Sequence, residues 1–134
     1  APAPAPTNSG NFTVGGEVQT PTTFTKTGFS AGFPYPFTII EVKNVKYLLE
    51  FNFNKSPLVD GEYTIGLSTK DEMVADLEIE DLTTGNSAAI FEGQTSKIKV
   101  AGNRITFTGM NTSLNGKSIA LAADLTVVKW PTEK

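Results

Sequence analysis

Every second side chain from Tyr47 to Phe53 is apolar, and Glu50, Asn52 and Asn54 alternate with the later ones; this is the clearest structural pattern in the chain. The apolar positions are Tyr47, Leu49, Phe51 and Phe53. Successive side chains of a β-strand point to opposite faces of the sheet, so a period of two predicts a strand with one buried face.

Similar segments recur along the rest of the chain, separated by turn residues. Glycine and asparagine between them, as at Gly15 and Gly16 or at Asn115 and Gly116, allow the positive φ angles that tight hairpin turns need. The predicted strands are residues 11–19 with a turn at the two glycines, 37–42, 46–54, 62–67, 88–92, 96–101, 104–110 and 118–128. About 8–10 short strands at this spacing predict an all-β fold, namely an antiparallel β-sandwich or a flattened barrel.

Residues 69–82 are compatible with two structures. Ser68 or Thr69 as a cap, followed by Asp71 and Glu72, would suit the first turn of a helix. From residue 75 onward, however, apolar side chains alternate with acidic ones, which is the period of a strand. The alternating residues are Ala75, Leu77 and Ile79 on one side and Asp76, Glu78 and Glu80 on the other. We favour the strand.

The first ten residues differ in composition from the rest of the chain. Proline occupies every second position of residues 1–6 and removes the backbone donors that a sheet needs, so an extended polyproline II segment is expected. We therefore predict a flexible N-terminal tether over residues 1–10 and a single β-sandwich domain over residues 11–134. The tether is either a stalk or a terminus without a role.

Composition excludes several kinds of chemistry. The 134 residues include no cysteine and no histidine, so a disulfide, a thiolate nucleophile, a Ser-His-Asp triad and an imidazole metal site are all excluded. The net charge is −3 and the chain has no basic stripe, which argues against nucleic acid as a partner. No apolar run reaches the length of a transmembrane segment. We expect a non-enzymatic protein without a metal or cofactor.

Two polar motifs have both a functional and a purely structural interpretation. The carboxylates of Asp76, Glu78 and Glu80 would share one strand face and could collect Ca²⁺, but they lack the loop spacing of such sites. We favour a solvated face that pairs with Lys97 and Lys99 of a later strand. The sequence of residues 115–118 ends like a phosphate-binding loop, but the glycine needed at position 111 is absent, which indicates a hairpin turn.

Four aromatic residues and two prolines lie together in residues 29–37. If exposed, they would form a rigid platform for a sugar or a protein, with Phe29, Phe33 and Tyr35 as the candidate ligand-binding residues. If buried, the same rings would plug one end of the sandwich. We favour the plug and keep the platform as the candidate site.

The order of these features resembles a family of small β-sandwich lipoprotein domains from Bacteroidetes cell envelopes. The similar segments are Phe12-Thr13-Val14-Gly15-Gly16, Asp60-Gly61-Glu62-Tyr63-Thr64-Ile65, and the hairpin from Arg104-Ile105-Thr106-Phe107-Thr108-Gly109 to Asn115-Gly116-Lys117. The resemblance implies an exported domain in the periplasm or on the cell surface, lipid-anchored in its precursor. It assigns no functional residue.

These observations lead to two expected functions. The first is a binding or adhesion module at the cell surface whose partner is a polysaccharide or a protein. The alternative is a structural subunit of a fibre, pilus or virion that self-associates by donating residues 7–19 as a strand to a neighbouring copy.

Overall fold

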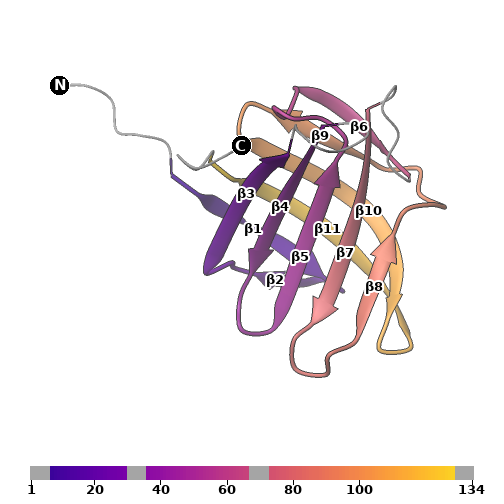
Figure 1. The fold of residues 1–134 in the computed structure, drawn as a ribbon. Coiled ribbons are helices and arrows are strands. Elements are labelled where there is room, and N and C mark those ends of the chain that lie inside the picture. Colours follow the sequence, from indigo (N-terminus) through magenta and orange to yellow (C-terminus); the bar gives the residue numbers. More distant parts are fainter. Residues whose placement is uncertain (1–6, 30–35, 67–72, 129–134) are drawn as a thin grey trace.

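The computed structural model describes residues 7–29, 36–66 and 73–128, and these ranges contain eleven strands (Figure 1). The strands are β1 Ser9–Val14, β2 Glu17–Gln19, β3 Thr23–Phe29, β4 Phe37–Lys43, β5 Tyr47–Phe53, β6 Gly61–Ile65, β7 Val74–Asp81, β8 Ser87–Ile90, β9 Lys97–Ala101, β10 Arg104–Leu114 and β11 Lys117–Thr126. This confirms the all-β prediction, with slightly more strands than expected. Within the described ranges, no helix is long and apolar enough to cross a membrane.

The strands form one sheet that folds over into two layers (Figure 1). The order is β2-β1-β11-β10-β9-β6-β7-β5-β4-β3, with β8 also paired to β7. All neighbours are antiparallel except β6 and β7, which run parallel over two residue pairs and connect the layers. The strands β2 and β3 end the path without pairing with each other, so the sheet is an open sandwich and not a closed barrel.

The core lies between the layers and contains the inward side chains of both. Phe51 packs edge-on against Phe107 of the opposite layer at 6.0 Å between ring centroids, and Phe53 packs against Tyr63 at 4.9 Å. The hydroxyl of the fully buried Tyr63 donates to the Val59 carbonyl at 2.7 Å, which satisfies its polar atom. The predicted inward face of residues 46–54 is confirmed, since Leu49, Phe51 and Phe53 are buried.

The strand β3 is absent from the strands predicted from the sequence. Its outward positions are three threonines and the terminal Phe29, whereas its inward positions are Phe24, Lys26 and Gly28. A buried lysine and a glycine at inward positions break the apolar alternation that identifies a strand, so the pattern was hidden. The structure also corrects the length of β10, which continues past Met110 to Leu114 across a bulge.

The ambiguous segment is a strand wherever the structure describes it. In β7, Ala75, Leu77 and Ile79 are buried, which confirms the favoured prediction for residues 74–81. Residues 69–72, where the helix start was considered, lie outside the described residues.

The sheet begins two residues before the predicted start of the domain. Ser9 and Gly10, which we had assigned to the tether, pair with Thr126 and Leu125 of β11. Just before them, the side-chain oxygen of Asn8 accepts a hydrogen bond from the Val128 amide at 2.7 Å. Residues 9–19, apart from the turn at the two glycines, are thus paired within their own sheet.

Candidate functional site

The predicted aromatic site is described only in part. Phe29 ends β3 directly opposite Phe37 at the start of β4, and their rings stack at 4.8 Å between centroids. Both side chains are partly buried. Phe33 and Tyr35 lie outside the described residues, so an aromatic platform for a ligand stays a prediction.

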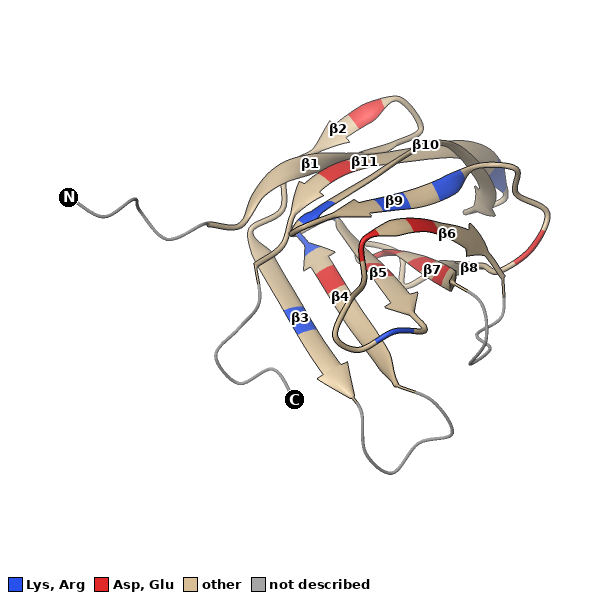
Figure 2. Cartoon of the chain, turned by 90° about the horizontal axis from the view of Figure 1, so that it is seen from above, with Lys and Arg blue, Asp and Glu red and all other residues tan. Residues whose placement is uncertain are grey.

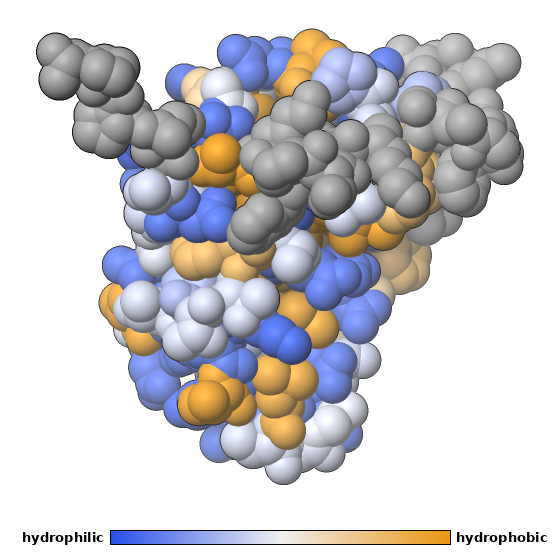
Figure 3. Space-filling model, turned by 60° about the vertical axis from the view of Figure 1, so that its left-hand side comes forward, coloured by the Kyte–Doolittle hydropathy of each residue, from blue (hydrophilic) through white to orange (hydrophobic). Residues whose placement is uncertain are grey.

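Large exposed apolar side chains do not gather into one patch on the face that Figure 3 shows, where separate hydrophobic areas lie among hydrophilic residues. The described residues of this kind are Val18, Val45, Val59, Leu82 and Phe91. They come from separate turns and strands, which favours a polar site over a broad apolar interface.

The pairing predicted between the acidic strand and the two lysines is wrong. β6 lies between β7 and β9, so Lys99 is opposite Glu62 and Lys97 is opposite Thr64. The sequence could not reveal this order, because β6 reaches β7 through a parallel contact of only two residue pairs. The acidic side chains of β7 and the two lysines are therefore separated by β6; Figure 2 shows acidic positions on β4, β5 and β7 and the basic positions of β9, which are its two lysines.

The outer face of β4, β5 and β7 carries a row of carboxylates, which we call the acidic row: Glu41, Glu50 and Glu78. Glu50 is directly opposite Glu41 on one side and Glu78 on the other. Burial, together with the nearby Glu41 carboxylate, raises the pKa of Glu50 to about 7. Burial and Glu78 likewise raise the pKa of the neighbouring Asp76 to about 6.

The acidic row does not form a metal centre. Among the described residues, no group of three or more acidic side chains is arranged to hold a metal ion. Carboxylates in a row across flat strands point the same way and do not surround a point in space, as a Ca²⁺ site requires.

A hollow opens on the outer face of the other layer, where β9 and β10 separate. The two strands pair only from Ala101 opposite Arg104 to Lys99 opposite Thr106. Beyond that point the pairing of β10 with β11 is interrupted between Phe107 and Met110, and Gly109 there adopts a φ of +67°. A bulge of this kind bends its strand, which here ends the ladder early. The Ser96 hydroxyl donates to the Gly109 carbonyl at 3.1 Å and spans the gap.

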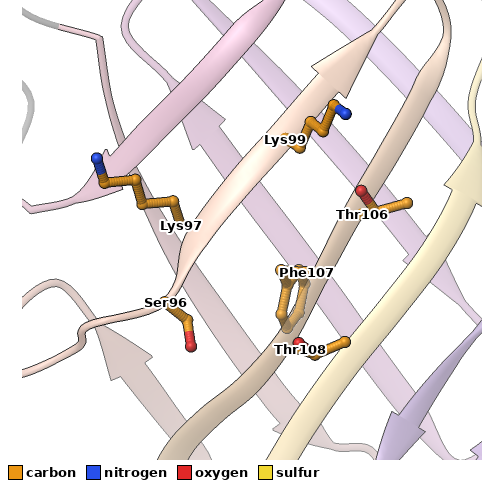
Figure 4. A pocket seen from close by; sticks show the side chains of 6 residues that line it. All are labelled: Ser96, Lys97, Lys99, Thr106, Phe107 and Thr108. Atoms are coloured by element: carbon orange, nitrogen blue, oxygen red, sulfur yellow. The ribbon is translucent and has the colours of Figure 1, made fainter.

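The hollow is about 260 Å³ in volume and is lined by lysine, serine and threonine residues over the buried Phe107. We call it the β9–β10 hollow; its other lining residues are Ser96, Lys97, Lys99, Thr106 and Thr108. In Figure 4 the Lys99 side chain lies on the side of β9 that faces Thr106, whereas the Lys97 side chain extends to the opposite side of that strand. Both lysines are exposed, and neither makes an ion pair or a side-chain hydrogen bond with the residues that the structure describes. Their charges are therefore available to a ligand.

A second hollow of about 280 Å³ adjoins the first and shares Lys99 and Thr106 with it. It also includes Arg104, whose guanidinium donates to both oxygens of Asp124 at 2.9 and 2.7 Å. This bidentate pair lowers the pKa of Asp124 and fixes the arginine on the sheet. The two hollows together form a continuous surface along β9 and β10, on which Lys97 and Lys99 are the cations without an ion pair among the described residues.

The chemistry of this surface is that of anion binding. Lysine ammonium groups and threonine hydroxyls can donate hydrogen bonds to carboxylate or sulfate oxygens. Sequence reasoning did find Lys97 and Lys99 on one strand face, but it gave them the wrong partner and missed the bulge at Gly109, which opens the hollow. Comparisons of the chain with models of protein families, with curated proteins and with solved structures give no match.

Proposed function

We propose that this domain is a non-enzymatic binding module that recognises an acidic polysaccharide through the β9–β10 hollow and its neighbour. One observation carries the proposal: Lys97 and Lys99 are exposed and unpaired among the described residues, beside hydroxyl groups in an open hollow. Following the resemblance, we place this function at a bacterial cell surface or in the periplasm.

A polymer suits this surface better than a small molecule. The two hollows are open and lie side by side, so each offers only a few contacts to one sugar residue. Several weak contacts along one chain add up, because the second contact is made within the same complex. The strands that carry these side chains are held by backbone hydrogen bonds to their neighbours, so the backbone loses little conformational freedom on binding.

Nucleic acid is a less suitable partner. Phosphate backbones require a broad basic surface, whereas here Glu62 is opposite Lys99 and Asp124 neutralises Arg104. The net charge of −3 would add a general repulsion.

The alternative function, self-assembly by strand donation, would require residues 9–19 to leave their own sheet. Residues 9–14 pair in continuous register with β11, and β2 pairs with β1. Each of these pairs would have to break before donation. We therefore prefer the binding module.

The proposal is tested by titrating the full chain with an acidic polymer, polygalacturonate, and with neutral dextran. We expect saturable binding of polygalacturonate that weakens as salt rises, and no binding of dextran. Replacing both Lys97 and Lys99 by glutamine should weaken binding at least about tenfold, because charge-assisted hydrogen bonds are lost.

Lys43→Gln is the matched control, because it removes one exposed lysine from the other layer and should leave binding unchanged. Equal binding by the double variant and the unaltered chain would refute the proposal. So would equal affinity for dextran. RNA is tested as a third ligand. If the chain binds it more tightly than polygalacturonate, the partner is a nucleic acid and the polysaccharide proposal is wrong.

A further inference from the structure

A cavity of about 290 Å³ lies where the β10–β11 turn meets the end of β1 and the start of β5. Its apolar lining comes from Val14, Leu114 and Ile119, with the Tyr47 side chain from the other layer. Lys117 and Asn115 provide the polar part of the lining. The cavity is at the opposite end of β10 from Arg104 and shares no lining residue with the β9–β10 hollow.

Hydrogen bonds hold the Asn115 side of this cavity in place. Asn115 has a φ of +55°, and its side-chain amide donates to Asp81 at 2.8 Å. Its side-chain oxygen accepts hydrogen bonds from Thr84 and Asn86. Hydrogen bonds from Thr83 and Asn115 lower the pKa of Asp81 to about 2, so this carboxylate stays charged at ordinary pH.

The Tyr47 side is held in the same way. The ammonium of Lys46 lies 5.6 Å from the centroid of the Tyr47 ring and forms an ion pair with Glu17 at 2.7 Å. The side-chain oxygen of Asn44 accepts hydrogen bonds from the backbone amides of Lys46 and Tyr47, both at 2.9 Å. The cavity is therefore already formed before any ligand binds.

The polar groups around the cavity determine what it can hold. The side-chain oxygen and nitrogen of Asn115 and the Lys46 ammonium already have hydrogen-bond partners. Few donors and acceptors therefore remain for the many hydroxyls of a sugar. Lys117 is exposed and makes no ion pair or side-chain hydrogen bond with the described residues. An apolar lining with one available cation suits a ligand with an apolar body and one negative charge.

We infer that this cavity is a binding site for a small apolar carboxylate, such as a medium-chain fatty acid, whose carboxylate pairs with Lys117 and whose chain contacts Ile119, Leu114 and Tyr47. A cavity of about 150 Å³ holds benzene, so this one has room for about ten non-hydrogen atoms. A ligand of that size in a half-open site should bind with a Kd of about 1 mM. The inference does not depend on polysaccharide binding, because the two sites have no residue in common.

The probe is octanoate, titrated into the full chain and followed by the methyl NMR signals of Val14, Leu114 and Ile119. We expect saturable shifts of these signals with octanoate. Octanol, which has no charged group, should bind more weakly. Lys117→Gln should weaken octanoate binding about twofold to fivefold, as expected for one exposed ion pair, while leaving octanol binding unchanged, because only the carboxylate uses the lysine.

Lys43→Gln, on a different surface, should bind octanoate as the unaltered chain does, and the exposed position of Lys117 allows its variant to fold, which the same spectra report. Shifts that do not saturate, or that appear on residues away from the cavity, would overturn the inference. Equal octanoate affinity for Lys117→Gln and the unaltered chain would overturn it as well. Loss of polygalacturonate binding would leave this result unaffected.

Discussion

Replacing Glu50 by glutamine should make the protein more stable at alkaline pH. Glu50 stands in the middle of the acidic row, with Glu41 of β4 and Glu78 of β7 directly across from it. Residues directly opposite in an antiparallel pair are only about 5 Å apart at Cα, so the three carboxylates repel one another when all are charged. Lys43 is on the same face of β4, but its partner across the ladder is Leu48.

The direction of the pH effect follows from the pKa of Glu50, which the folded state raises from 4.5 to about 7. The folded protein holds this proton more tightly than the unfolded chain does, so the stabilisation is complete below pH 4.5. It is lost as the pH rises through about 7.

The size of the effect follows from the same values. A rise from 4.5 to about 7 corresponds to about 3 kcal/mol. The side chain is partly exposed, so solvent screening reduces this to about 1–2 kcal/mol. Glutamine is neutral at every pH and can still donate a hydrogen bond to Glu41.

The assay is urea unfolding of both proteins at pH values from about 4.5 to 8, with stability extrapolated to water. The two proteins should be nearly equal in stability at the acidic end, and Glu50→Gln should be more stable by about 1–2 kcal/mol at pH 8. Glu92→Gln, at an exposed loop carboxylate, is the control and should follow the unaltered protein. A constant difference between Glu50→Gln and the unaltered protein across the whole pH range would refute the reasoning.

Two further substitutions test the core and the bulge. Tyr63→Phe removes the hydroxyl that bonds to the backbone carbonyl and amide of Val59. Urea unfolding should therefore show a free energy of unfolding that is lower by about 1–2 kcal/mol. An unchanged unfolding midpoint would contradict this prediction. Gly109→Ala places a Cβ on a residue with a φ of +67°, at 3.4 Å from the Ser96 hydroxyl. The free energy of unfolding should fall by about 1 kcal/mol in the same assay, and polygalacturonate binding should weaken. Full stability with full binding would show that the bulge does not require glycine.

Most of the fold could be predicted from the sequence because the inward positions of its strands are apolar. The alternation in β5, β7 and β11 is visible in the chain because each inward side chain is buried against the other layer. β3 shows where this reasoning fails. Lys26 is only 7% exposed at an inward position, and the sequence pattern identifies an inward strand residue only when it is apolar.

The candidate site could be predicted only in part, because it depends on which strands are neighbours. Lys97 and Lys99 were recognised as one strand face, but their partners are set by β6, which is inserted between β9 and β7. The hollow itself depends on a break in pairing between β9 and β10. Neither the insertion nor the break leaves a local signal, since both are determined by contacts between segments far apart in the chain.

The acidic residues on the outer face of β4, β5 and β7 give the proposed binding a direction. The outer face of β4, β5 and β7 carries Glu41, Glu50, Asp76, Glu78 and Glu80, with Lys43 as a cation on the same side. An acidic polymer is repelled from that face and can approach the lysines of β9 only from the other side. The acidic row lowers stability at alkaline pH, as the raised pKa of Glu50 indicates. It would nevertheless leave the β9–β10 surface as the favourable place for an anionic chain.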